Sequence, residues 1–233
     1  DGRASNNSAP LGAAPMTSSV WLRPERTGVG RPPRWTRDEV TRAAVAVADR
    51  EGIEAVTMRR VGAELGTGAG SLYRYVQSRD ELLDLMADLV AGEYSFADPT
   101  GDWLADLVDV GLQAREIHRR HTWLPERVMT SPAVGPRTVE LLERYLAVVA
   151  GVPADDRIKL TAFGIMNALI ALLARNEQVD PVMVRNAEFM AHIVGAGSHP
   201  HLSALRAPAT SSVDPLPEIL RAVLTGFLDV RSS

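Results

Sequence analysis

The chain of 233 residues contains no cysteine, and of its 25 basic Lys and Arg residues only Lys159 is a lysine. The absence of cysteine excludes disulfides, thiolate metal sites and cysteine nucleophiles. The near absence of lysine leaves arginine as the basic side chain, and arginine is the better ligand for phosphate and guanine. An apolar content of 45% is ample for a globular core.

The chain also lacks an apolar run of membrane-spanning length. Its most apolar stretch runs from Leu160 to Ala174, between Lys159 and Arg175, and falls short of the roughly 20 residues that a bilayer requires. We therefore expect this stretch to be a buried helix. The first residues are polar and lack the apolar segment of a secretory signal. These absences predict a cytoplasmic protein that does not enter a membrane.

Motifs of common enzyme classes are missing as well. The sequence has no phosphate-binding loop, no H-E-x-x-H zinc motif and no nucleophile elbow. The only acid–base cluster is His118 and His121 with Glu116 or Glu126, and we interpret it as a solvated surface rather than a metal or catalytic site. We therefore predict no catalytic residue, no metal site and no cofactor.

The net charge of −4 is unevenly distributed. Residues 1–80 hold 12 arginines and 9 acidic residues, a net charge of +3, whereas residues 81–233 hold 13 basic and 20 acidic residues, a net charge of −7. A protein that binds nucleic acid needs a local basic surface rather than a basic total. The charge split favours such a surface in the first third of the chain.

Hydrophobic periodicity and capping signals predict helices throughout. In the first helix Val40, Ala44 and Val47 share one face, and Thr36 with Glu39 forms a capping box. A second capping box, at Ser78 and Glu81, opens a long apolar helix. The expected helices cover about 37–51, 57–65, 69–75, 79–90, 101–120, 124–130, 136–150, 155–178, 181–194 and 215–230, with a long loop at 195–215. No strand pattern of useful length appears, so the predicted fold is all-α.

These elements predict three segments. Residues 1–35 form a disordered leader and an arginine-containing arm, in which residues 1–15 lack periodicity and Met16 is a candidate natural start. The arm is either a solvated tail or a basic segment that follows phosphates or enters the minor groove. Residues 36–95 form a three-helix DNA-binding head with a long linking helix, and residues 96–233 form a helical ligand-binding and dimerisation domain.

The head contains two helices joined by a short turn at Gly66, which is the pattern of a helix-turn-helix whose second helix enters the DNA major groove. Leu72 and Val76 are expected to face inward and leave polar and aromatic side chains outside. Candidate DNA contacts are Thr57, Arg59, Thr67, Gly68, Gly70, Ser71, Tyr73, Arg74, Tyr75 and Arg79. The alternatives are that the two tyrosines pack inside the head and that Arg59 and Arg60 form a solvated helix face.

This region resembles the TetR family of transcriptional regulators. The resemblance runs from Thr41-Arg42-Ala43-Ala44 through residues 51–62 and 65–76 to residues 78–83. It implies an all-α homodimer with a DNA-binding head and a ligand-binding body, usually a repressor that a small molecule releases from its operator. It also implies DNA contacts from Thr57, Arg59, Gly70, Ser71, Tyr73, Tyr75 and Arg79.

The chain departs from the family pattern at three of these positions. The family often has Ser in place of Gly68, His in place of Tyr75 and Lys in place of Arg79. The first departure weakens a helix cap and its phosphate contact. The body is similar to the tetracycline-repressor-type subgroup at Val128-Met129, Gly135-Pro136 and Pro200-His201-Leu202.

An apolar cavity with a few polar groups is expected to bind the small-molecule effector. Its candidate residues are Trp103, His118, Trp123, Met129, Phe163, Met166, Asn167 and Ile170. Asn167 needs a hydrogen-bond partner, which is a ligand, a neighbouring helix or a dimer mate, and the apolar candidates are alternatively core or dimer residues. Dimerisation is expected through residues 155–178 and the last helix, whose stripe is Ile219, Leu220, Val223, Leu224, Phe227 and Leu228. A two-fold dimer predicts a palindromic operator.

Three functions are compatible with these patterns. The first is a ligand-responsive regulator of a double-stranded DNA operator, most simply a repressor. The second is an all-α small-molecule-binding protein or enzyme with a degenerate head, which loss of turnover on His118→Ala would favour. The third is an interaction module, because Gly68 and Gly70 weaken the short recognition helix. The sequence names neither the effector nor the operator, and it does not separate repressor from activator.

Overall fold

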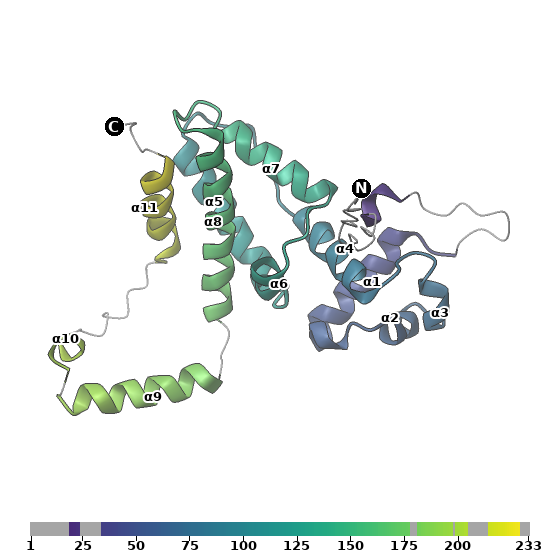
Figure 1. Cartoon of the computed structure of the whole chain (residues 1–233), viewed down its shortest axis with the longest axis horizontal. Coiled ribbons are helices and arrows are strands. Elements are labelled where there is room, and N and C mark those ends of the chain that lie inside the picture. Colours follow the sequence, from purple (N-terminus) through teal and green to yellow (C-terminus); the bar gives the residue numbers. More distant parts are fainter. Residues whose placement is uncertain (1–18, 24–33, 178–180, 198, 205–213, 229–233) are drawn as a thin grey trace, which may run out of the picture.

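In the computed structural model, residues 19–23, 34–177, 181–197, 199–204 and 214–228 are described, and the regular structure within them is entirely helical. The head contains α1 (Arg37–Glu51), α2 (Met58–Glu64) and α3 (Ala69–Leu72), and α4 (Arg79–Ala91) follows it. The body contains α5 (Trp103–Arg120), α6 (Leu124–Thr130), α7 (Pro136–Val148), α8 (Asp156–Asn176), α9 (Pro181–Gly195), α10 (Pro200–Ser203) and α11 (Leu216–Leu228). Figure 1 shows the head at one end of the molecule, with α4 between it and the body. The all-α prediction is confirmed.

Capping side chains begin the head helices where the sequence predicts. The Thr36 hydroxyl accepts a hydrogen bond from the Glu39 backbone, and the Glu39 carboxylate accepts one from the Thr36 backbone, so the first capping box is present. Thr57 caps α2 and Ser78 caps α4, each through its hydroxyl alone. The Glu81 carboxylate accepts from the Gln77 backbone and not from that of Ser78, so the second predicted capping box is only half formed. A cap of this kind stabilises a helix by about 1 kcal/mol.

The turn between α2 and α3 depends on two glycines. Gly66 has a φ of 64°, in the left-handed region that side chains disfavour. Gly62 lies directly against the turn, because a Cβ at this position would stand 2.9 Å from the carbonyl oxygen of Thr67 and 3.2 Å from the backbone nitrogen of Ala69. Both neighbours are backbone atoms that cannot rotate away. The close approach of α2 and α3 therefore requires the absence of a side chain at residue 62.

In the body, α5, α8 and α11 pack against one another around a shared apolar core. The predicted stripe of α11 divides into two. Leu220, Leu224 and Leu228 are buried within the chain, whereas Phe227 lies on another side of the helix and is 38% exposed. The intramolecular core thus uses one set of α11 side chains and leaves a second set uncovered.

The helix α8 is likewise covered on one side only. Met166 and Ile170 are buried, but Leu160 and Leu172 are exposed. The expectation of a buried helix therefore holds for one face only, because side chains four residues apart repeat along a second face that points away from the core. Among the described residues, α8 is the one helix whose length and composition would suit a membrane span, and its inner face is committed to the body core.

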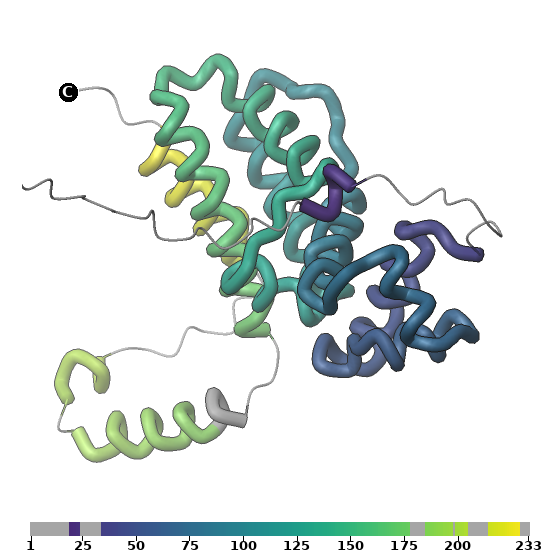
Figure 2. Tube along the Cα trace, turned by 45° about the vertical axis from the view of Figure 1, so that its right-hand side comes forward, coloured from purple at the N-terminus to yellow at the C-terminus, as the bar shows by residue number. Residues whose placement is uncertain are grey.

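The helices α9 and α10 extend away from the body (Figures 1 and 2). Part of the region expected to be a loop forms α10, which begins at Pro200, a residue whose fixed φ favours the first helical position. Phe189 and Met190 on α9 are exposed. Residues 205–213, which also belong to the expected loop, lie outside the described residues.

Residues 19–23 of the predicted arm are folded against the head. Val20 is buried, its carbonyl accepts a hydrogen bond from Arg37, and Arg23 forms an ion pair of 2.5 Å with Glu81. The expectation of a disordered arm is wrong for these residues, because apolar burial and the Arg23 ion pair hold them in place. The remainder of the leader and arm, residues 1–18 and 24–33, lies outside the described residues.

A cluster that we call the His121 joint connects the head to the body. It consists of the buried His121 and Trp123 and the more exposed Asp49 and Glu93. The His121 Nδ1 atom lies 2.8 Å from Asp49 on α1, and its Nε2 atom lies 3.0 Å from Glu93. The Trp123 indole donates to Asp49 at 2.7 Å. The interpretation of His118 and His121 as a solvated surface is therefore wrong, since both side chains are buried where α5 ends against other elements.

Candidate DNA-contact surface and ligand cavities

Six of the predicted DNA-contact residues are exposed, and all come from the start of α2 or from α3 and its flanks. We call them the α2–α3 face: Thr57, Arg59, Gly68, Gly70, Tyr73 and Arg74. Figure 1 shows α3 at the end of the head farthest from the body, so the body does not cover it. A Cβ built on Gly68 or Gly70 would meet nothing within 4 Å. The geometry thus leaves room for another molecule to approach the backbone of α3 closely.

The other hydroxyl candidates of this region, Thr67 and Ser71, are half-buried and hydrogen-bonded to each other. Their side-chain oxygens are 2.7 Å apart, and Ser71 donates to the Gly68 carbonyl at 2.7 Å. Gly68 itself supplies no side-chain cap to α3. The Ser71 hydroxyl therefore stabilises the first turn of α3, where the sequence predicts that Gly68 weakens the cap.

Arg59 and Arg60 are neighbours in sequence but have different surroundings. Arg60 lies 2.6 Å from Glu51 and 2.9 Å from Glu64, and these hydrogen-bonded carboxylates, Glu51 first, raise the pKa of its guanidinium above the ordinary value. Arg59 is exposed and has no ion pair with any described residue. Arg59 is thus available to a phosphate or a base, whereas the charge of Arg60 is compensated within the head.

The two tyrosines also differ. Tyr73 is 54% exposed, but Tyr75 is only 9% exposed, and its hydroxyl accepts a hydrogen bond from the Trp35 backbone at 3.2 Å. The packing interpretation therefore holds for Tyr75, and its prediction as a DNA contact is corrected. After α3, the backbone nitrogens of Tyr75 and Val76 both donate to the Leu72 carbonyl.

The Arg79 side chain is hydrogen-bonded to the backbone segment that precedes α2. Its guanidinium donates to the carbonyls of Val56 at 2.7 Å and Ile53 at 2.8 Å. Arg79 thus positions this segment, and only its remaining N–H groups are left for a phosphate. Arg74 is exposed, and its guanidinium carbon lies 5.2 Å from the centre of the Tyr75 ring.

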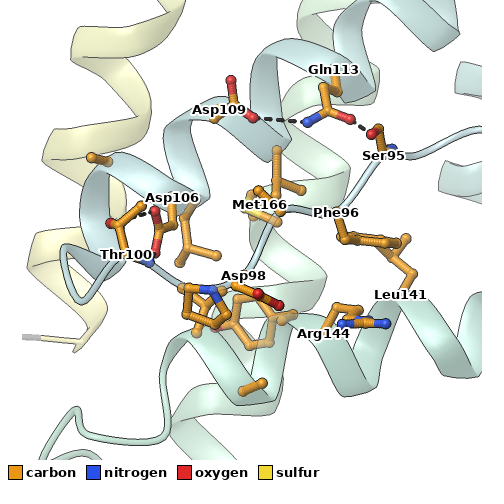
Figure 3. Close-up of a pocket in the computed structure, with 18 of the residues that line it drawn as sticks. Ser95, Phe96, Asp98, Thr100, Asp106, Asp109, Gln113, Leu141, Arg144 and Met166 are labelled. Atoms are coloured by element: carbon orange, nitrogen blue, oxygen red, sulfur yellow. Dashed lines mark hydrogen bonds between the residues drawn. The ribbon is translucent and has the colours of Figure 1, made fainter.

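Two cavities that open to solvent lie among the described residues of the body. The first, of about 340 Å³, we call the carboxylate cavity, because Asp98, Asp106 and Asp109 line it together with aromatic and apolar side chains (Figure 3). Thr100 donates to Asp106, and Gln113 donates to Asp109 at 2.8 Å while accepting from the Ser95 backbone. These hydrogen bonds fix the positions of two of the three carboxylates.

The second cavity, of about 260 Å³, we call the histidine cavity, because His118 lies in its wall. Its other walls come from α4, α6, α7 and α8, and it shares Leu141 and Phe163 with the carboxylate cavity. Burial, with a smaller repulsion from His121, lowers the pKa of His118 to about 4. His118 is therefore uncharged near neutral pH, and its Nδ1 atom has no hydrogen-bond partner among the described residues.

Four of the eight predicted ligand residues line a cavity. His118 and Asn167 line the histidine cavity, Met166 lines the carboxylate cavity, and Phe163 lines both. Asn167 donates its amide to the Phe163 carbonyl at 2.8 Å, so a neighbour on its own helix satisfies part of its hydrogen-bonding capacity.

The other four predicted ligand residues line neither cavity. Ile170 is in the body core, Trp103 packs against that core, Trp123 belongs to the His121 joint and Met129 is exposed. The cavity residues that the sequence analysis missed include Tyr94, Arg127, Thr138 and Arg144. Their sequence signal is weak, because Arg127, Thr138 and Arg144 are polar residues of amphipathic helices and Tyr94 follows the end of α4.

Comparison with known proteins matches both halves of this architecture. Residues 40–86 match the model described as bacterial regulatory proteins of the tetR family, and residues 97–216 match the tetracycline-repressor-like C-terminal domain. The chain belongs to the TetR family. The TetR N-terminal match covers most of α1–α4, and the C-terminal match begins before α5 and ends at α11.

Individual TetR-family relatives agree with this assignment. The chain is 36% identical over 160 residues to the HTH-type transcriptional repressor DrrR1 of Streptomyces coeruleorubidus, a match that covers 68% of this chain and 59% of that repressor. The crystal structure of apo ActR from Streptomyces coelicolor superposes with a TM-score of 0.73 at 26% identity, covering 86% of this chain and 97% of ActR. ActR in complex with actinorhodin gives a TM-score of 0.71 at 26% identity, with coverages of 85% and 99%.

Proposed function

We propose that this TetR-family chain is a cytoplasmic transcriptional repressor that binds a palindromic operator and leaves it when a small molecule enters the body. Residues 36–95 are the proposed DNA-binding domain, and residues 96–233 are the proposed ligand-binding and dimerisation domain. The exposed α2–α3 face carries the proposal, because it offers unpaired arginine, an exposed tyrosine and two unobstructed glycines at the free end of the head. A repressor among the relatives supports the choice of repression.

The proposed homodimer uses the uncovered faces of α8 and α11. Leu160, Gly164, Ala168 and Leu172 follow one another every four residues on α8, and all four are exposed. Such a stripe, with small residues at its centre, permits close packing of two helices. The exposed Phe227 of α11 extends the apolar surface. Two heads related by a two-fold axis would bind half-sites spaced by helical turns of DNA.

Both cavities support the ligand-responsive part of the proposal. They lie among α4–α8, and ActR, a structural neighbour of the same family, has been crystallised with actinorhodin. The four predicted residues that line them, His118, Phe163, Met166 and Asn167, are retained as proposed ligand contacts. The relatives are named as regulators and repressors, so we propose no catalytic step.

A gel shift with the DNA upstream of the gene for this protein tests the proposal. We expect a sequence-selective, salt-sensitive complex, and Arg59→Ala is expected to weaken it by about tenfold because one available guanidinium is lost. Arg60→Ala is the matched control, since its charge is already paired with Glu51 and Glu64, and it is expected to weaken the complex much less. Equal losses from the two variants, or no selective complex, would contradict the proposed surface.

A further inference from the structure

The histidine cavity directly contacts the helix that carries the head. Ala87, Val90 and Ala91 of α4, with Tyr94 just beyond it, form part of the cavity wall. Because α4 packs against α1 of the head, a molecule in this cavity would touch an element shared with the DNA-contact domain. The carboxylate cavity has no α4 residue among its lining residues.

Arg127 belongs both to the cavity wall and to a link with α4. It lines the histidine cavity from α6, and its guanidinium is ion-paired with Asp84 of α4. The Arg127 side chain is only 13% exposed, and its Nε atom is buried without a hydrogen-bond partner among the described residues. A buried N–H group without an acceptor is costly. Arg127 therefore has an unused donor, and its paired nitrogen is held by a carboxylate that another acceptor can replace.

A second link lies one helical turn further along α4. Asp88 is buried and accepts hydrogen bonds from the Thr138 backbone at 2.9 Å and from the Thr138 hydroxyl at 3.1 Å. Thr138 also lines the histidine cavity. Thus two neighbouring aspartates on one face of α4, Asp84 and Asp88, are bound by two residues of the cavity wall.

The polar side chains in the wall of the histidine cavity indicate which class of ligand it binds. No acidic residue is among the described residues that line it, and its polar groups are the Arg127 guanidinium, the uncharged His118 and the Thr138, Asn167 and Tyr94 side chains. These groups solvate an oxygen acceptor, above all an anionic one, and offer no counter-charge to a cation. The rest of the lining is apolar and accommodates a ring system.

We infer that the histidine cavity binds an apolar, ring-containing molecule with an anionic or strongly accepting oxygen, and that Arg127 binds this oxygen in place of Asp84. The oxygen occupies the donors of Arg127, and the link between α6 and α4 opens. The α4 helix is then held to the body by Asp88, which keeps its hydrogen bonds to Thr138 and its 3.8 Å ion pair with Arg137, and by apolar contacts. This inference rests on the proposed function, because it names the ligand class and the coupling residue of the same effector site.

Calorimetric titration of the full chain with three matched probes tests the ligand class. The probes are 2-naphthoate, 2-naphthol and 2-naphthylmethylamine, which share one ring system and are anionic, neutral and cationic near pH 7. We expect 2-naphthoate to bind at least about tenfold more tightly than the amine, because hydrogen bonds to a charged acceptor are the strong ones. Equal binding of the two ions, a preference for the amine, or no binding of any probe would overturn the inference.

Two variants and a control test the residue assignment. Arg127→Gln is expected to abolish the preference for 2-naphthoate, whereas Arg144→Gln, which changes an arginine of the carboxylate cavity, is expected to retain it. Asp84→Asn removes the competing carboxylate and is expected to tighten 2-naphthoate binding several-fold. If Arg127→Gln does not fold, the test depends on Asp84→Asn. Unchanged or weaker 2-naphthoate binding by that variant overturns the assignment of Arg127.

The coupling between the histidine cavity and DNA binding is measured separately. The measured quantity is the protein concentration that half-saturates upstream DNA, with and without 2-naphthoate. Saturating 2-naphthoate is expected to raise this concentration for the wild type and not for Arg127→Gln. Probe selectivity without any DNA complex would leave the cavity assignment in place and end the repressor proposal. A DNA complex without probe selectivity would leave the repressor proposal in place and end the cavity assignment.

Discussion

Replacing Tyr73 with alanine is expected to weaken the complex with operator DNA by about thirtyfold while leaving the free energy of unfolding nearly unchanged. The Tyr73 ring is 54% exposed on the α2–α3 face, so its removal costs the head little packing. An exposed aromatic ring at a contact surface becomes buried when the partner binds, and such residues contribute disproportionately to affinity. Fluorescence anisotropy with labelled operator and urea unfolding together measure the two quantities.

The adjacent residue supplies the matched control. Leu72 is fully buried in the core of the head, and Leu72→Ala is expected to lower the free energy of unfolding by about 2–5 kcal/mol. Loss of DNA binding in that variant would reflect an unfolded head. A Tyr73→Ala variant that lost stability to a similar degree would show that Tyr73 is a packing residue.

His121→Ala is expected to destabilise the protein by about 2 kcal/mol, because a buried imidazole and its two hydrogen bonds are lost. The imidazole lies between Asp49 and Glu93, which face it from α1 and from the end of α4. Its removal takes one hydrogen-bond partner from each carboxylate, although the Trp123 indole still donates to Asp49 and Arg120 still pairs with Glu93. The loss combines an unfilled cavity with the loss of the imidazole's hydrogen bonds to both carboxylates.

Urea unfolding of the variant measures this effect, and Arg120→Ala is its control. Arg120 pairs with the same Glu93 at 2.8 Å, but its side chain is 59% exposed, and an exposed pair of this kind contributes about 0–1 kcal/mol. If His121→Ala costs no more than Arg120→Ala, the joint does not hold the head to the body.

The local structure of the head is largely readable from the sequence. The capping box at Thr36 and the hydroxyl cap at Ser78 set the starts of α1 and α4, because a side chain three residues away in sequence satisfies a free backbone group. The apolar spacing of Val40, Ala44 and Val47 likewise identifies the buried face of α1. Both signals are local, so one short window of sequence contains them.

The features that the sequence analysis missed depend on partners far along the chain. Tyr75 turns inward toward Trp35, 40 residues away, while Tyr73 does not, and nothing in their shared residue type distinguishes them. His121 meets Asp49 across 72 residues, which is why a buried joint resembled a solvated cluster. The position of Arg127 in a cavity wall likewise depends on how α4 and α6 pack.

The most direct test of the α2–α3 face as the DNA-contact surface uses Gly68 and Gly70. Their backbone amide signals report contact with DNA in the unsubstituted protein. Selective ¹⁵N-glycine labelling gives one backbone signal for each of the 18 glycines, and single Gly→Ala variants assign those of Gly68, Gly70 and Gly151. On titration with operator DNA, the account predicts that the Gly68 and Gly70 signals shift or broaden, while that of Gly151, between α7 and α8, stays in place. A saturated complex in which Gly68 and Gly70 are unmoved and Gly151 shifts would contradict it.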